Sequence, residues 1–287
     1  MLELVRSLRK NQRLLTDLVK RDLRARYVAS SMGFFWSVIF PLLNLFVYMF
    51  VFTFVLKSRW RLDMPNQESA VLMLAGIIVW QAFAETISRS TNTLVENQNL
   101  IQKVVFPSEV LPTYLVTSAL INMLIGIAIT LLAVGWFAWV DPPAPIEVPE
   151  GYVASVRHKP LGFSFTLISL PLLVILQALF TLGYGYFLAA LNLFVRDVYH
   201  LIGVALTVWM FMTPIFYPPS LVQEAGLEWI LKINPMYWLI DSYRDVLVYG
   251  LWPKPQVVGT FGVVAIVLFS LGSLFFMRQK PRFPDLL

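Results

Sequence analysis

Long apolar runs alternate with shorter polar segments along the chain. Six runs approach or exceed the roughly 20 residues that a helix needs to cross the hydrocarbon core of a bilayer. They cover residues 33–56, 70–87, 111–140, 161–194, 198–217 and 257–277. Because lipid offers no hydrogen-bond partner to an exposed backbone, such segments must be helical. The pattern predicts an all-α polytopic membrane protein with six transmembrane helices and one domain over residues 1–287.

Composition supports this interpretation and removes several kinds of chemistry. Hydrophobic residues make up 58% of the chain and charged residues 14%, against about a quarter charged in a soluble domain. The chain has no cysteine and two histidines, which excludes disulfides and thiolate sites and leaves little for a metal. It has no phosphate-binding loop of the Gly-x-x-x-x-Gly-Lys type, so we expect no ATP hydrolysis by this chain.

Lysine and arginine are unevenly divided between the two sides that six spans would create. Residues 1–32, 88–110, 195–197 and the tail after 277 carry 14 of them. Residues 57–69, 141–160 and 218–256 carry 8. Loops rich in these residues remain in the cytoplasm. We therefore expect both termini to be cytoplasmic.

Residues 2–24 have the pattern of an amphipathic helix. One half of its surface is apolar and the other basic, which is typical of a helix that lies in the interface beside anionic headgroups. The alternative is a basic flank that only sets the topology. A membrane span follows directly, so we expect membrane lipids, and no nucleic acid, as partners. The apolar positions are Leu4, Val5, Leu8, Leu14, Leu15, Leu18, Val19 and Leu23, and the basic ones are Arg6, Arg9, Lys10, Arg13, Lys20, Arg21 and Arg24.

The cytoplasmic segment 88–110 interleaves polar and apolar residues before Pro107. This pattern predicts a short helix with one apolar face that ends near the proline. Two interpretations stay open, a docking helix for a cytoplasmic partner and an ordinary connector that buries its apolar face in the bundle.

The outer segments are rich in proline. Residues 141–160 predict an extended, irregular excursion. In residues 218–250, Asn234-Pro235 should open a short helix and Gly250 should close it. This helix is too short and too charged to span, so it should be re-entrant or interfacial. Within it, Asp241, Arg244 and Asp245 can pair at a spacing of three residues or lie adjacent.

The predicted spans offer neutral rather than ionisable groups. Glu85 is their only carboxylate and lies near an end, which argues against proton coupling. Aromatic rings can stack on sugar faces and amides can bind hydroxyls, although lipid-facing rings and helix-packing amides would produce the same pattern. One alternative function is a membrane acyl- or glycosyltransferase, which would need clustered acids or a histidine at the interface. The remaining alternative is a structural membrane scaffold.

Four stretches together resemble the membrane subunit of ABC-2 type polysaccharide exporters, the family that exports O-antigen, teichoic acid and capsule. The Phe-Pro-x-Glu form of residues 106–109 and the Asn-x-Phe-x-Arg-Asp form of residues 192–197 favour O-antigen or teichoic acid over capsule. The Arg26 to Trp36 stretch disfavours a lipid or drug exporter of the same superfamily. The stretches are Arg21 to Trp36 with Pro41, Asn97 to Lys103 with Phe106 to Pro112, Leu191 to Asp197, and Thr213 to Pro218 with Asn234 to Trp238.

The resemblance implies a transport subunit, not an enzyme, that works as a homodimer in the bacterial inner membrane. Two copies of a separate ATPase would bind ATP and Mg, with no cofactor in this chain. The cargo would be an undecaprenyl-diphosphate-linked polysaccharide, with O-antigen favoured.

The resemblance also assigns roles to parts of the chain, with an interfacial gate helix over 1–32, a cytoplasmic coupling helix over 88–110 and outer gate helices over 218–250. By residue, it implies an entrance gate (Arg24, Arg26, Tyr27, Ser30, Trp36), ATPase coupling (Glu96, Asn97, Asn99, Leu100, Lys103), a translocation path (Phe40, Asn44, Tyr48, Asn122, Gln177), an outer gate (Tyr217, Tyr237, Trp238) and a structural loop (Arg196, Asp197).

Overall fold

The computed structural model describes residues 2–28, 35–55, 60, 66–103, 106–140 and 164–287. Its regular elements are all helical over these ranges. Four helices are long and apolar enough to cross a membrane. They are α4 (Asn66–Glu96), α6 (Val110–Trp139), α7 (Leu170–Phe194, preceded by a 3₁₀ turn η3, Phe165–Ser169) and α12 (Pro255–Gln279).

The other two predicted spans are shorter. Helix α3 (Trp36–Met49) contains Pro41 and continues as a π-helical turn, η2 (Phe50–Val55). Helix α8 (Val198–Met212) is apolar but has only 15 residues. The structure thus confirms an all-α architecture over the described residues, with four helices long enough to span a membrane, whereas the count of six stays a prediction.

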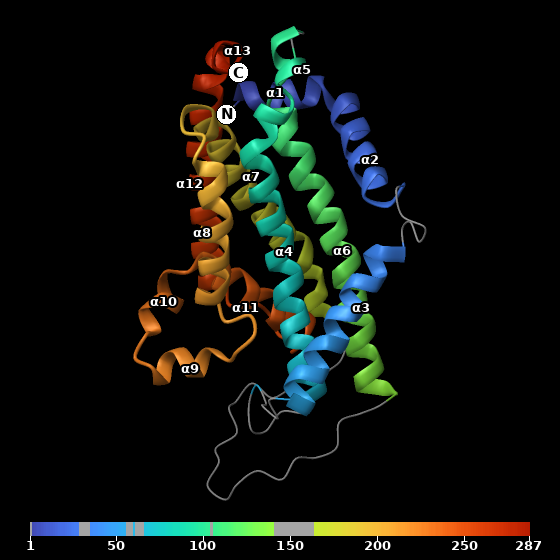
Figure 1. Cartoon of the computed structure of the whole chain (residues 1–287). Coiled ribbons are helices and arrows are strands. Elements are labelled where there is room, and N and C mark those ends of the chain that lie inside the picture. Colours follow the sequence, from blue (N-terminus) through green and yellow to red (C-terminus); the bar gives the residue numbers. More distant parts are fainter. Residues whose placement is uncertain (1, 29–34, 56–59, 61–65, 104–105, 141–163) are drawn as a thin grey trace, which may run out of the picture.

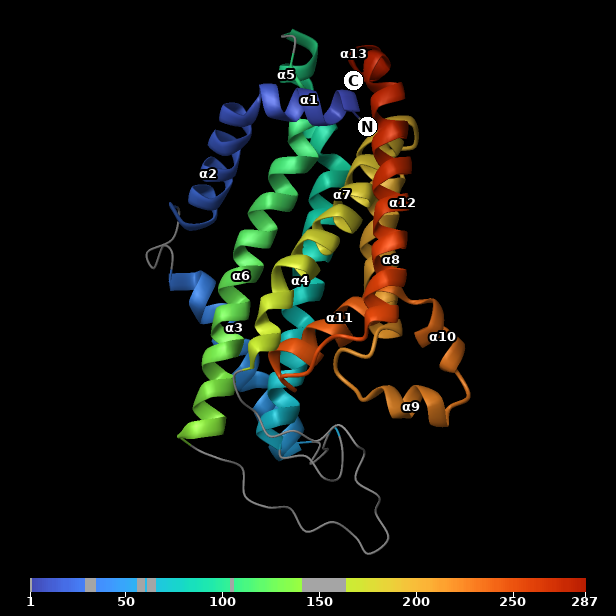
Figure 2. The same ribbon diagram turned by 180° about the vertical axis from the view of Figure 1, so that it is seen from behind.

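Both termini lie at the same end of the bundle (Figure 1). This end also carries α1 (Leu2–Lys10), α5 (Gln98–Lys103), the turn η4 (Lys280–Arg282) and α13 (Phe283–Leu286). The opposite end carries α9 (Pro219–Glu224) and α10 (Glu228–Ile233), while α11 (Pro235–Leu247) runs back among the long helices (Figures 1 and 2). All segments expected in the cytoplasm that the structure describes therefore gather at one end.

Helix α4 forms the centre of the bundle, with 83% of its apolar stretch buried. An aromatic cluster joins it to α7 and α8. The ring centroid of Phe83 lies 5.6 Å from that of Phe180 and 5.3 Å from that of Trp209, within the range in which aromatic pairs attract. Helices α7 and α12 approach closely because Gly183 faces the backbone of Leu268 and Phe269, and Gly272 faces the backbone of Gly183.

Two element boundaries differ from the sequence-based expectation. The predicted helix over residues 2–24 is two helices, α1 and α2 (Gln12–Val28), which meet at Asn11, whose side chain donates to the Ser7 carbonyl at 2.9 Å. The second predicted span does not end at 87, because α4 continues to Glu96. Ser90 and Thr93 are buried against the bundle there, so tertiary packing extends the helix beyond its apolar run.

Candidate functional site

A closed set of ion pairs attaches α2 to α4. Within α2, Arg26 Nε lies 3.2 Å from Asp22 Oδ2, and within α4, Arg89 Nη1 lies 3.1 Å from Glu85 Oε1. Between the helices, Arg26 pairs with Glu85, and Arg89 pairs with Asp22. Each charge therefore touches two charges of opposite sign. We call Asp22, Arg26, Glu85 and Arg89 the charge ring.

A third helix joins the ring at its most buried member. Ser118 in α6 donates a hydrogen bond to Asp22, whose side chain is 9% exposed. Burial by itself would raise the pKa of Asp22. The hydrogen bonds from Arg89 and Ser118, with the charges of Arg89 and Arg26, outweigh burial and lower this pKa below its ordinary value. Asp22 is therefore held as a carboxylate between three helices.

A second polar contact ties both ends of the chain to α6. The Glu109 side chain is fully buried, accepts a hydrogen bond from Ser7 of α1, and lies 2.6 Å from Nζ of Lys280. Tyr186 of α7 donates to the Glu109 carbonyl oxygen at 3.1 Å. The Phe-Pro-x-Glu stretch thus holds the two termini together beside the start of α6.

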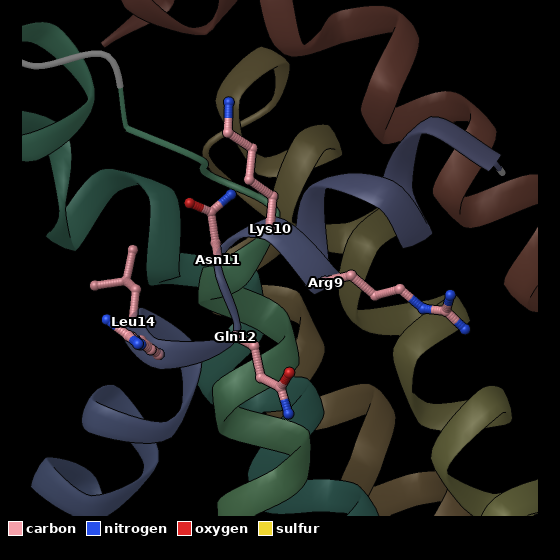
Figure 3. Close-up of a pocket in the computed structure, with 6 residues that line it drawn as sticks. Arg9, Lys10, Asn11, Gln12 and Leu14 are labelled. Carbon is pink, nitrogen blue, oxygen red and sulfur yellow. The ribbon is translucent and has the colours of Figure 1, made fainter.

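The bend between α1 and α2 carries a polar, basic pocket of about 500 Å³ (Figure 3). Arg9 and Lys10 extend in different directions from the end of α1, and Gln12 begins α2 (Figure 3). The basic side chains of the predicted polar face are exposed, whereas Leu4, Leu18 and Val19 are buried against the bundle. The two faces predicted from sequence are confirmed, with Val5 as an exposed exception.

The predicted coupling residues lie at the end of the bundle that holds the termini. Glu96 ends α4 and accepts a hydrogen bond from Asn92 at 3.0 Å, and Asn97 joins α4 to α5 by donating to the Thr93 carbonyl at 2.8 Å. Asn99 and Leu100 lie on α5, and both are exposed. Ile101 and Leu94 are buried instead. The short helix therefore buries part of its apolar face and leaves Leu100, 40% exposed, at the surface; the Lys103 side chain lies outside the described residues.

The predicted entrance-gate residues are only partly described. Arg24 is exposed on α2, and Arg26 points inward to the charge ring. Trp36 is half-buried at the start of α3. Ser30 and the side chain of Tyr27 lie outside the described residues. The structure does not bring Arg24, Arg26 and Trp36 together by any described contact.

The predicted path residues lie on three helices, α3, α6 and α7. Gln177 is buried in α7 and donates to the Val79 carbonyl of α4 at 3.2 Å, which is the packing role that was its alternative. Asn44 and Asn122 are half-buried in α3 and α6. The side chains of Phe40 and Tyr48 lie outside the described residues. The described contacts join none of these residues into one path.

The outer segment is organised by Asn234. Its side chain accepts from the backbone N–H groups of Met236 and Tyr237, which caps α11 at the predicted Asn-Pro start. It also accepts from Trp209 at 2.9 Å and donates to Thr213 at 2.8 Å. This one side chain therefore fixes α11 against the end of α8. Gly250 follows the helix with a φ of 57°, as its predicted closing role requires.

The three predicted outer-gate residues lie near this junction. Tyr217 donates to the Phe211 carbonyl, and Trp238 donates to the Leu231 carbonyl at 3.0 Å. Tyr237 and Trp238 line a pocket of about 250 Å³ that Asp241 also borders. All three aromatic side chains are half-buried.

Arg244 does not pair with Asp241 in the expected way. Its side chain is buried, and its N–H groups donate to the backbone carbonyls of Leu72, Pro214 and Ile215 at 2.8 to 3.0 Å. Its guanidinium carbon also lies 4.6 Å from the ring centroid of Trp60. Arg244 thus braces α11 against α4 and the segment after α8.

The tight turn after α7 is held by a different residue from those predicted. Arg196 and Asp197 are both exposed, and Asp197 occupies the position before α8 without a side-chain capping bond. Asn192 is buried instead and accepts from the Tyr199 backbone N–H at 3.2 Å.

The sequence-based site omitted Asp22, Glu85, Arg89 and Ser118. Asp22 and Arg26 are four residues apart, as are Glu85 and Arg89, so both helical pairs were visible in the sequence. Nothing in their spacing shows that the two pairs meet. That information lies in the packing of α2 beside α6.

Known proteins are similar to this chain over most of its length. The ABC-2 type transporter family matches residues 13–248. The O-antigen export system permease protein RfbA of Myxococcus xanthus is 31% identical over 99% of both chains. The protein of the same name from Klebsiella pneumoniae is 28% identical over 96% of this chain and 95% of its own. The polysialic acid transport protein KpsM of Escherichia coli is 20% identical over 92% of each. The chain belongs to the ABC-2 type transporter family.

Proposed function

We propose that this chain is the membrane subunit of an ATP-driven exporter that moves a lipid-linked polysaccharide out of the cytoplasm, with O-antigen as the favoured cargo. The observation that carries the proposal is the similarity over nearly the full length to permeases named for O-antigen export. The similarity to a polysialic acid transport protein supports the broader cargo class of polysaccharide. Teichoic acid and capsular polysaccharide remain alternative cargoes.

We further propose that the subunit works as a homodimer with two copies of a separate ATPase, which bind ATP and Mg. The end of the bundle with both termini would face the cytoplasm of a bacterial inner membrane, as the distribution of lysine and arginine supports. The exposed α5 would then contact the ATPase. Glu96, Asn97, Asn99, Leu100 and Lys103 are the residues proposed for this contact.

The basic outer face of α1 and α2 suits an approach to anionic lipid headgroups and to the diphosphate of an undecaprenyl carrier. Residues 1–32 would form the entrance gate, and residues 218–250 the outer gate. The latter proposal is supported by the position of α9, α10 and α11 at the opposite end of the bundle (Figure 2).

Co-purification tests the proposal. The tagged chain, extracted in mild detergent, should bring down a nucleotide-binding ATPase at equal stoichiometry, and hydrolysis should require both proteins. A membrane enzyme or a scaffold would be isolated intact without any ATPase, and that outcome would refute the exporter assignment. If the complex forms, the surface polysaccharide that disappears on deletion of the chain distinguishes O-antigen from teichoic acid and capsule.

A further inference from the structure

The charge ring is the strongest described link between α2 and α4. Helix α2 packs along α6, as both views show, whereas the described bonds between α2 and α4 are ion pairs made by long side chains (Figures 1 and 2). These side chains span the gap between the helices and leave no member of the ring without an opposite charge. The charge ring therefore connects α2 to α4 where the backbones of these two helices make few contacts.

The ring also lies between two regions with separate proposed roles. Helix α4 continues from Arg89 to Glu96 without interruption and then leads through Asn97 into the exposed α5. Helix α2 carries the basic face at the membrane surface. A displacement of α5 would move the end of α4, and the ring would transmit that displacement to α2.

Breaking the ring in each transport cycle would be costly. Asp22 is nearly buried and accepts from Arg26, Arg89 and Ser118, so loss of its partners would leave an ionised group unpaired. Helix α2 packs along α6, and the described polar contact between these two helices is one charge-assisted hydrogen bond, from Ser118 to Asp22. The geometry therefore favours ion pairs between α2 and α4 that remain intact during transport.

We propose that Asp22, Arg26, Glu85 and Arg89 are positioning residues that make α2 move together with the cytoplasmic end of α4, and so couple the ATPase to the entrance gate. This inference rests on the proposed function. It adds a transmission element that neither helix pattern nor family membership assigns.

Charge inversion within one helix tests whether the charge ring makes α2 and α4 move together. The α2 inversion exchanges Asp22→Arg and Arg26→Asp, and the α4 inversion exchanges Glu85→Arg and Arg89→Glu. Each keeps net charge and its own helical ion pair but sets like charges against each other between the helices. The combination of both inversions restores every opposite-charge contact, so it is a matched control that contains all four substitutions.

Transport per ATP hydrolysed is the first measurement, made with the complete complex. Each single-helix inversion should still assemble with the ATPase, and its transport per ATP should fall at least about tenfold. The combined inversion should recover to within about threefold of the wild type. Normal transport in the single-helix inversions would overturn the proposal, as would a combined variant that assembles normally but transports no better than they do.

Distance measurement supplies a second readout that needs no polysaccharide. The chain has no cysteine, so spin labels can be placed at Lys20→Cys and Gln98→Cys, both exposed, in chains diluted with unlabelled protein. In the wild type the distance should stay the same with and without ATP. In each single-helix inversion it should broaden or shift with ATP, and the combined inversion should restore it.

The two readouts separate the possible failures. If the wild-type complex exports no polysaccharide, the proposed function fails while the label distance still decides the role of the ring. If the combined inversion does not accumulate in cells, Asp22→Asn decides instead. It should broaden the distance distribution and lower transport per ATP at least about threefold, and unchanged values would overturn the inference.

Discussion

The close approach of α7 and α12 gives a quantitative prediction for Gly183→Ala. Gly183 lies in α7 against the backbone of α12. A methyl group at this position would lie 2.6 Å from the Leu268 carbonyl carbon and 2.7 Å from the Phe269 nitrogen. Both obstacles are backbone atoms, so no side-chain rotation can relieve the clash.

The magnitude follows from the separation that the methyl group would impose. Ordinary van der Waals contact begins at 3.4 Å, so α7 and α12 would have to move apart by about 0.8 Å. Over-packing of this kind costs about 1–3 kcal/mol, and separation also weakens dispersion contacts along the helix pair. We expect the free energy of unfolding to fall by about 3 kcal/mol.

The assay is reversible unfolding of the purified chain in mixed micelles. Gly259→Ala in α12 is the control, because nothing lies within 4 Å of its added methyl group and alanine favours a helix. It should leave the unfolding free energy unchanged or slightly raised. An equal loss in both variants, or no loss in Gly183→Ala, would show that close packing of α7 on α12 does not stabilise the fold.

Three further predictions concern the polar contacts and the coupling segment. Arg244→Lys should lower the unfolding free energy by about 3 kcal/mol, because lysine cannot serve three diverging carbonyls, and an unchanged value in the same assay would contradict the bracing role. Because the pKa of Asp22 is lower in the folded protein than in the unfolded chain, the ionised side chain stabilises the fold. Its contribution to the free energy of unfolding is complete above the unfolded-state pKa of about 3.9 and is lost as the pH falls through the lower folded-state pKa. A fluorophore at Lys20→Cys should therefore report α2 as docked at pH 5 and released only below about pH 4, and release near pH 6 would contradict this. Glu96→Ala should reduce partner-stimulated ATP hydrolysis while membrane insertion stays normal, and undiminished hydrolysis would exclude a docking role.

The spans were predictable because apolar length alone decides whether a helix can cross lipid. This signal located α4, α6, α7 and α12. Local chemistry predicted the start of α11 as well, because the Asn234 cap and Pro235 act within a few residues of each other.

Contacts between distant segments were not predictable in the same way. The sequence allowed Arg244 to pair within its own helix, but the carbonyls it binds belong to residues 172, 30 and 29 positions away. The extension of α4 to Glu96 depends on the burial of Ser90 and Thr93, which composition alone marks as polar. The charge ring combines two visible helical pairs through a meeting of helices that no periodicity encodes.

We propose that this chain and a separate ATPase together move a lipid-linked polysaccharide across a membrane. The most direct test of this proposal is transfer in proteoliposomes that contain both proteins, with the polysaccharide supplied on the side of the ATPase. We expect the glycan to become accessible on the opposite side only when both proteins and hydrolysable ATP are present. Transfer without ATP, or no transfer by an assembled complex that hydrolyses ATP, would contradict it.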